Sequence, residues 1–193
     1  MVSTTAYLFF LGLLGSERIL ELVISGRNAR RSRAQGAIEV GQRHFRSMAI
    51  FHSLFLASCA AEQLLLNRPF LGAVSWIALG GALAAQALRY WTVRTLGYRW
   101  TVRVLVIPGA QPVTSGPFRF VRHPNYLAVV TEMICVPLVH GCWLTAAIFS
   151  LGNAVLLFIR IRVEERALGP TYADAFADRP RFLPKLAGRR HGV

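Results

Sequence analysis

Long apolar runs, separated by arginine-rich segments, make up most of this chain. They cover residues 4–25, 47–66, 70–91 and 124–161. About 20 apolar residues cross a hydrocarbon core of about 30 Å, so each of the first three runs matches one span. The last run is too long for one span, and Pro137 and His140-Gly141 predict a break that leaves helices over 124–138 and from 142 into the 160s. We therefore predict an all-α integral membrane protein with about five transmembrane helices, of which the fourth is short, at about 20 Å.

The segments between the runs predict the orientation in the membrane. Residues 26–46 and 92–123 are rich in arginine, so the positive-inside rule places both on the cytoplasmic side, with the N-terminus outside and the C-terminus inside. We expect 26–46 to be a polar loop. Asn67-Arg68-Pro69 predicts a tight outer turn that makes the second and third spans a helical hairpin, and 101–107 is typical of a short strand-like or irregular piece.

Composition supports the membrane interpretation. The chain has 193 residues, of which 54% are hydrophobic, and a formal net charge of +13. Such a charge also fits nucleic-acid binding, but the arginines lie beside apolar spans, so we expect no nucleic-acid partner. Lys185 is the one lysine, a bias typical of a GC-rich genome, so we expect a bacterial protein of the inner (cytoplasmic) membrane. The three cysteines have no metal-type spacing, and we expect them to pack without a disulfide or a metal.

Several charged residues interrupt the spans. Glu17, Arg18 and Glu21 share one helix flank in the first span, and Glu132 lies in the fourth. The polar interruptions of the second span are His52, Glu62 and Gln63. Charges inside a span are costly and usually face protein or water. We expect ion pairs that tie helices together, including an unidentified partner for Glu132. A role of Glu132 in a substrate pocket remains the alternative.

Two polar stretches stand apart from this pattern. The first, Gly116–Tyr126, is GPFRFVRHPNY, in which His123-Pro124 predicts a helix start because proline suits the first helical turn. A helix N-terminus offers free N–H groups to an electron-rich ligand, although a basic clamp on lipid phosphates explains the arginines equally well. The second stretch, 160–168, places Arg160 and Glu164 four residues apart, which suits either a site or a structural ion-pair cluster.

Together the two stretches resemble the isoprenylcysteine carboxyl methyltransferase family of integral membrane enzymes. The matching patterns are RHPNY at 122–126 preceded by VTSGPF at 113–118, R-x-x-x-E-E-x-x-L at 160–168, and PRFLP at 180–184. The resemblance covers about 90–185. It implies one domain over 1–193, with three spans in 1–91, a cytoplasmic cofactor-binding half in 92–185 and a mobile tail at 186–193.

The resemblance also implies a cofactor and roles for particular residues. S-adenosylmethionine would bind, and S-adenosylhomocysteine would leave as the product. Glu164 would hold the amino group of the cofactor, Arg160 would face the acceptor, and Glu164 or Glu165 would serve as a base. The implied cofactor-lining residues are Arg103, Val113, Phe118, His123, Pro124, Asn125 and Tyr126.

Two departures from the family pattern bear on the acceptor. Ala128 replaces a frequent glycine, and the usual segment after the second motif is shortened to 169–176. We expect methylation of an oxygen (carboxylate, phenol or enol) on a lipophilic acceptor that enters from the bilayer. A long-chain polyketide phenol or pyrone is preferred over a prenyl-cysteine, because bacterial relatives of this type are associated with such phenols and pyrones.

The sequence leaves other functions open. The alternatives are a membrane NADPH-dependent reductase of the sterol-reductase type, a phospholipid N-methyltransferase and a non-enzymatic membrane module. The expected partners are membrane lipids and the small-molecule acceptor. The oligomeric state stays open.

Overall fold

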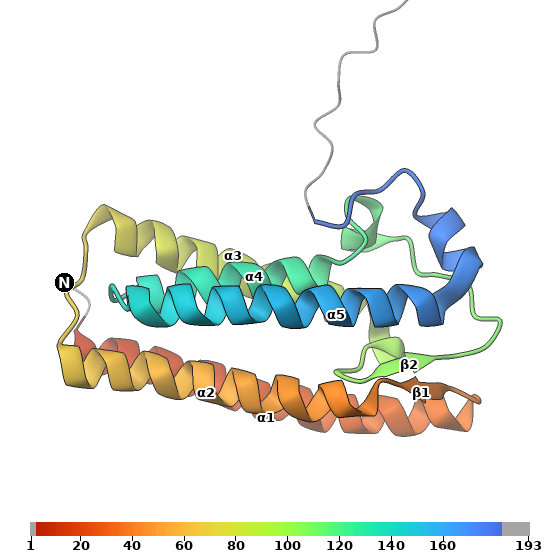
Figure 1. Cartoon of the computed structure of the whole chain (residues 1–193), viewed down its shortest axis with the longest axis horizontal. Helices are drawn as coiled ribbons and strands as arrows, with labels where there is room; N and C mark the ends of the chain where they lie inside the picture. Colours follow the sequence, from red (N-terminus) through yellow and green to blue (C-terminus); the bar gives the residue numbers. More distant parts are fainter. Residues whose placement is uncertain (1–2, 183–193) are drawn as a thin grey trace, which may run out of the picture.

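The computed structural model describes residues 3–182, apart from the side chains of residues 42–45. The predicted tail at 186–193 lies outside the described residues. In the described part the helices are α1 (Thr4–Ala34), α2 (Gln42–Leu66), α3 (Ala73–Leu96), α4 (Pro124–Leu138) and α5 (Trp143–Ala175). Two short strands, β1 (Ile38–Val40) and β2 (Val104–Val106), and the 3-10 helices η1 (Gly97–Arg99) and η2 (Gly116–Arg119) complete the chain. The helices run roughly along one direction, with the strands gathered at one end (Figure 1).

The helices pack in an order different from the one predicted. α3 packs mainly on α4, α4 on α5, and α2 on α1 and α5, so the expected hairpin of the second and third spans is wrong (Figure 1). Small residues of α3 allow its close contact with α4. A Cβ added at Gly81 would lie 2.6 Å from Sγ of Cys135, and Ala78 and Ala82 beside it are buried. The predicted close approach of this helix is therefore made to α4.

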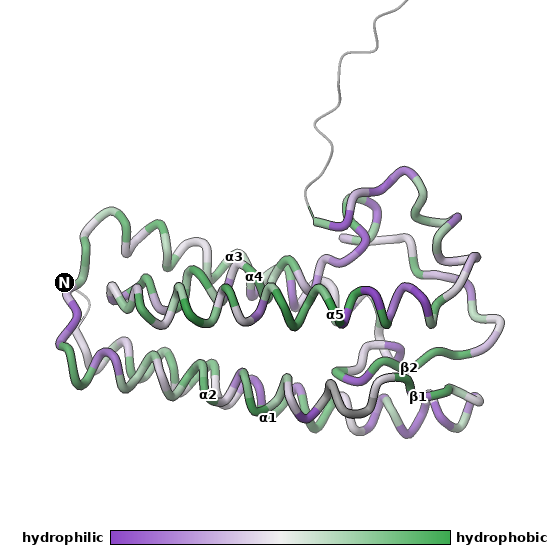
Figure 2. The backbone as a smooth tube through the Cα atoms, viewed as in Figure 1, coloured by the Kyte–Doolittle hydropathy of each residue, from purple (hydrophilic) through white to green (hydrophobic). Residues whose placement is uncertain are grey.

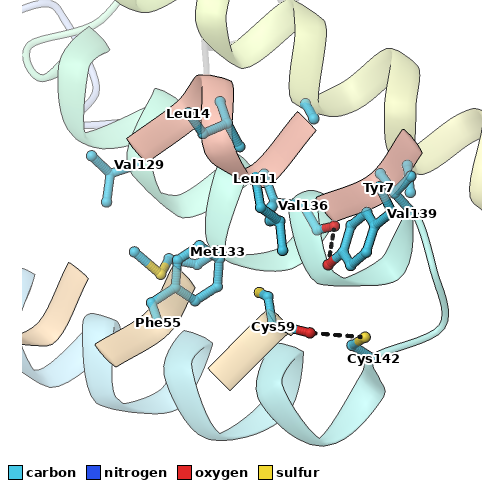
Figure 3. Close-up of a cluster of buried hydrophobic side chains, with 12 residues drawn as sticks. Tyr7, Leu11, Leu14, Phe55, Cys59, Val129, Met133, Val136, Val139 and Cys142 are labelled. Carbon is cyan, nitrogen blue, oxygen red and sulfur yellow. Dashed lines mark hydrogen bonds between the residues drawn. The ribbon is translucent and has the colours of Figure 1, made fainter. Parts of the chain in front are cut away.

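A buried apolar cluster joins α1, α2 and α4. Leu11 and Leu14 of α1 meet Phe55 of α2 and Met133 of α4 in this cluster (Figure 3). The hydroxyl of Tyr7 donates to the backbone oxygen of Val136 at 3.2 Å, which satisfies a polar group inside the cluster. Cys59 and Cys142 pack in the same cluster, as predicted, and Cys135 packs against it. All three cysteines are free. This core lies away from the strands.

The outer faces of the long helices are apolar. Large exposed side chains include Phe9, Leu13 and Ile24 on α1, Ile50 and Leu65 on α2, Ile77 and Leu83 on α3, and Leu151 and Phe158 on α5. Hydrophobic residues dominate most of the helix length, and hydrophilic ones gather near the strands (Figure 2). An exposed apolar surface of this extent is typical of contact with lipid. Among the described residues, the helices over Arg46–Leu66 and Trp143–Ala175 are long and apolar enough to cross a membrane, and Pro124–Leu138 is apolar but shorter.

The first arginine-rich segment is largely helical, which corrects the predicted loop at 26–46. α1 continues to Ala34, with Arg31 and Arg33 in its last turn, and β1 follows at Ile38–Val40. Arginine is a good helix former, and a cation in the last turn interacts favourably with the helix dipole. Strand β1 pairs antiparallel with β2, in the register Ile38 to Val106. The strand-like piece predicted within 101–107 is thereby confirmed.

The charges inside α1 form the expected ion pairs. Arg18 binds Glu21 at 2.6 Å and reaches Glu132 of α4 at 3.1 Å. Arg89 of α3 binds both carboxylate oxygens of Glu132, with its Nε at 3.1 Å from Oε1. Gln86 Nε2 donates to Glu17 at 2.6 Å. The predicted partner of Glu132 thus exists, and α1, α3 and α4 are tied together by one charged cluster.

Glu62 has a different structural role at the other end of the bundle. Its carboxylate accepts from the backbone N–H of Thr145 at 2.7 Å and of Leu144 at 3.3 Å, in the first turn of α5. Arg68 Nε lies 2.9 Å from the same carboxylate. The first N–H groups of a helix have no partner within the helix, so Glu62 of α2 caps α5.

Candidate functional site

A cavity of about 850 Å³ opens at the end of the bundle that carries the strands. Its walls come from α1, α2, α3, the segment between Arg99 and Val113, the start of α4 and the last turns of α5. Ligand pockets measure about 300–1,000 Å³, so this one has room for a large ligand or for two smaller ones.

The hydroxyl of Tyr126 joins the two stretches singled out in the sequence. It accepts a hydrogen bond from Nε of Arg160 at 2.8 Å and donates one to the carboxylate of Glu164. Arg160 is buried, and its Nη2 donates to the backbone oxygen of Val102. The expected Arg160–Glu164 pair is therefore bridged by a phenol, and all three groups line the cavity.

Helix α4 begins at Pro124, as the His-Pro step predicted, with His123 as its N-cap. The His123 ring stacks on Tyr126 with 5.3 Å between centroids, and its Nε2 lies 3.0 Å from Oε1 of Glu165. Arg181 binds both oxygens of Glu165, at 3.0 and 2.6 Å. Glu165 is not among the residues that line the cavity, so its contacts suit positioning of His123, and its expected role as a base stays a prediction.

The segment after α5 returns to the RHPNY stretch. Gly169 has φ of 72° and interrupts the helical geometry of α5, which redirects the chain. The backbone N–H of Arg122 then donates to Pro180 at 2.9 Å, and that of His123 to Arg181 at 3.2 Å. The described part of the predicted PRFLP ending therefore fastens the two motifs to each other, whereas residues 183–184 lie outside the described residues.

The VTSGPF loop needs its glycine. Gly116 has φ of 57°, a conformation that favours glycine, and a Cβ there would collide with Thr95 of α3. Close packing of η2 on α3 holds the loop. Val113 and Phe118 of this loop line the cavity, and their expected contact with the cofactor stays a prediction.

Arg103 lines the cavity and also belongs to a charged cluster at the strands. Its Nη1 lies 2.6 Å from Glu39 of β1, which binds Arg33 of α1 as well. Burial raises the pKa of Glu39, but hydrogen bonds from Arg103 and Arg33 outweigh it and hold the pKa of that carboxyl below its usual value. Arg103 thus anchors β2 to β1 over the cavity.

Asn125 carries an oxygen that the protein leaves unused. Its buried Oδ1 has no hydrogen-bond partner among the residues that the structure describes, and the side chain lines the cavity. Buried polar atoms almost always have a partner, so this oxygen is an exception within the described part of the chain, and the surrounding atoms shield it from the open cavity.

The N-terminal half contributes more to the cavity than the sequence indicated. Arg18 and Glu21 of α1, His52 of α2 and Arg89 of α3 line the same cavity as the C-terminal motifs. The sequence marked Arg18, Glu21 and His52 as polar interruptions of apolar runs, but it did not reveal which helices face one another. We expected residues 92–185 alone to form the cofactor pocket, but α1, α2 and α3 also contribute residues to the cavity wall.

Comparison of the sequence with known proteins gives a matching family and similar proteins. A model of the isoprenylcysteine carboxyl methyltransferase (ICMT) family matches residues 76–170. The chain is 36% identical to "Uncharacterized protein YpbQ" of Bacillus subtilis (strain 168) over 159 residues, which cover 82% of this chain and 94% of the relative. It is 32% identical to an uncharacterized protein of Haemophilus influenzae over 152 residues, which cover 78% of this chain and 88% of that relative.

The fold and the cavity define a helical membrane protein that holds a charged pocket at one end of an apolar bundle. The chain belongs to the ICMT family, a family of membrane methyltransferases, as the RHPNY and R-x-x-x-E-E-x-x-L patterns indicated. Family membership favours a methyltransferase over the reductase and the non-enzymatic module.

Proposed function

We propose that this protein transfers a methyl group from S-adenosylmethionine to an oxygen of a lipophilic acceptor that enters from the bilayer. The observation that carries the proposal is the Tyr126 hydroxyl, which bridges Arg160 and Glu164 on the wall of a cavity of about 850 Å³. A long-chain phenol or pyrone is the preferred acceptor, and a prenyl-cysteine carboxylate the alternative.

The residues around the cavity fit the chemical groups of the cofactor. Glu164 offers a carboxylate to the amino group, and Asn125 lines the same cavity. Phe118 and Tyr172 line the same cavity and supply aromatic faces, which attract cations and stack on a purine. When bound, the cofactor supplies an electrophilic methyl group on a sulfonium. His123, Pro124, Val113 and Arg103 complete the proposed lining.

Arg160 is the proposed contact for the acceptor oxygen. Its guanidinium is always charged and is buried, so its attraction to an anionic oxygen is weakly screened. The bonds to Tyr126 and Val102 fix its orientation. The chain thus holds the acceptor in line with the methyl group, and such alignment is a large part of what this displacement requires.

The same proposal includes the membrane arrangement. All five helices are embedded, with the cavity end in the cytoplasm of a bacterial inner membrane and the N-terminus outside. The apolar outer faces of α1 and α3 support embedding of these two helices as well. Membrane lipids surround the bundle, and no nucleic acid takes part.

Calorimetric titration of the purified protein with S-adenosylhomocysteine and with NADPH tests the cofactor. We expect binding of the first, no heat from the second, and weaker binding of the first in Glu164→Gln. Binding of NADPH alone would contradict the proposal. Transfer of a labelled methyl group to a long-chain phenol, a pyrone, a prenyl-cysteine or phosphatidylethanolamine then identifies the acceptor, and labelling of the phospholipid amine alone would exclude oxygen methylation.

A further inference from the structure

His52 of α2 lies at the cavity wall, deeper in the bundle than the RHPNY stretch. Met48, four residues earlier, packs in a buried cluster with Tyr126, Leu157 and Ile161. Residues four apart lie on the same helix face with an axial rise of about 6 Å. The imidazole of His52 is therefore about one helical turn from the level of Tyr126, on the side away from the strands.

The protonation of the His52 ring follows from its one hydrogen bond. Nδ1 lies 2.8 Å from the backbone oxygen of Met48. A carbonyl oxygen only accepts, so Nδ1 carries the hydrogen, and in the neutral ring Nε2 presents a lone pair. Within the described part of the chain, no hydrogen bond engages Nε2. The ring thus brings an unengaged proton acceptor to the cavity.

The charges around His52 suit a neutral ring that becomes protonated for a short time. Arg18 and Glu21 of α1 and Arg89 of α3 line the same cavity. Glu132 of α4 lines a small adjoining hollow together with His52 and Arg18. Two of these groups are acidic and two basic, and they are paired with one another. The pairing leaves no carboxylate free to hold His52 charged at rest, so the ring rests neutral and the imidazolium formed in the step is short-lived.

The cavity wall contributed by α2 also suits an apolar acceptor. Ala49, Ser53 and Leu56 flank His52 on the lining, and Gly15 and Ile19 of α1 face the same space. On this wall, small and apolar side chains lie beside the imidazole of His52. An acceptor chain held along these residues would bring its polar head to His52.

We propose that Nε2 of His52 is the general base that removes the proton of the acceptor hydroxyl, so that the acceptor is a phenol or enol rather than a carboxylate. This inference rests on the proposed function. In the step, the acceptor oxygen forms the new bond to the methyl carbon, and the methyl–sulfur bond breaks with its electron pair left on sulfur. The hydroxyl proton moves to Nε2 and then leaves through the water of the cavity. A carboxylate acceptor is already ionised at neutral pH and needs no base.

Replacement by an amide tests the proton transfer. His52→Gln places a polar amide near the position of Nε2, and this amide cannot accept the proton. With pentadecylphenol as acceptor we expect kcat/KM to fall about 10²- to 10⁴-fold, the usual contribution of a general base. With a nitro derivative that is already ionised at the assay pH, the loss should stay below about tenfold. The parent rate on pentadecylphenol should rise with pH through one inflection that His52→Gln abolishes.

Two further variants separate base catalysis from loss of structure. His140→Gln removes a buried histidine that binds the backbone of Arg68 and does not line the cavity, so both acceptors should react at rates close to those of the parent. His52→Ala should regain rate on pentadecylphenol when imidazole is added. Equal losses on both phenols, no loss on either, or absence of rescue would overturn the inference.

Different experimental results would contradict the role of His52 and the proposed function. A parent protein that binds S-adenosylhomocysteine and methylates only the carboxylate of N-acetyl-farnesylcysteine would overturn the role of His52 and leave the methyltransferase proposal standing. A parent protein that does not bind S-adenosylhomocysteine would contradict the proposed function itself.

Discussion

Removal of the Tyr126 hydroxyl is the sharpest test of the proposed cofactor site, because this one oxygen joins Arg160 to Glu164. Tyr126→Phe deletes both hydrogen bonds and keeps the ring, which stacks on His123 and packs in the cluster with Met48. The substitution therefore alters the polar contacts of the cavity wall without opening a void in the core.

The expected magnitude follows from the two bonds that are lost. A hydrogen bond to a charged group contributes about 1.5–3 kcal/mol, so two of them set an upper limit of about 3–6 kcal/mol. Water in the cavity will solvate the freed carboxylate of Glu164 and guanidinium of Arg160 and recover part of this. We expect the dissociation constant of S-adenosylhomocysteine to rise about 10- to 100-fold, which corresponds to about 1.4–2.8 kcal/mol.

Titration calorimetry and thermal unfolding of three proteins provide the measurement. Tyr7→Phe is the matched control, because the Tyr7 hydroxyl is also buried but donates to Val136 in the core, at 3.2 Å. It should lose about 1 kcal/mol of stability and bind S-adenosylhomocysteine as the parent does. If Tyr126→Phe binds as tightly as the parent, or if Tyr7→Phe weakens binding to the same extent, the Tyr126 hydroxyl does not organise a cofactor site.

Three further predictions concern the acceptor, the charged cluster and the topology. Arg160→Lys keeps the charge but loses the planar fork, so turnover should fall by about one to three decades with little change in S-adenosylhomocysteine affinity, and a rate close to that of the parent would remove Arg160 from the mechanism. Glu132→Gln removes the carboxylate that binds Arg89 through both oxygens and also reaches Arg18, and only Glu21 then faces both arginines among the described carboxylates of this cluster. The free energy of unfolding should fall by about 3 kcal/mol in a denaturation series; a change below about 1 kcal/mol would mean that the cluster is weakly coupled. Single cysteines at Gln35 and Pro69 should react with a membrane-impermeant maleimide from opposite sides of the membrane, and labelling from one side would refute the orientation.

Features that depend on neighbours in sequence were predicted best. The start of α4 at Pro124 follows from proline geometry alone, because the residue before proline avoids the helical region and proline suits the first turn. The break before α5 follows from Pro137 and His140-Gly141, and Gly141 has φ of 62°. Each of these signals acts within a few residues, so no knowledge of the rest of the fold was needed.

Features that depend on distant partners were predicted poorly. The arginines after residue 26 were taken as loop residues, yet they continue α1 to Ala34 because the end of this helix packs on η1 and Asn28 donates to the backbone of Gly97 and Trp100. Strand β1 has only three residues, and the residues that pair with it in β2 lie 64 to 68 positions further along the chain. A strand this short has no periodicity of its own, so its sequence carries no signal without its partner.

The residues of the candidate site also fall into those that local sequence predicted and those that depend on the packing of distant helices. His123, Tyr126, Arg160 and Glu164 were found because two local motifs carry them, and the resemblance implied that the motifs meet. His52 was visible only as a polar interruption of an apolar run. Its importance depends on the order of the helices, since it faces the cavity only because α2 packs beside α1 and α5 rather than against α3. In the predicted hairpin α2 would have lain against α3. Instead, Gly81 lets α3 approach Cys135 of α4 closely, and the face of α2 that carries His52 completes the cavity.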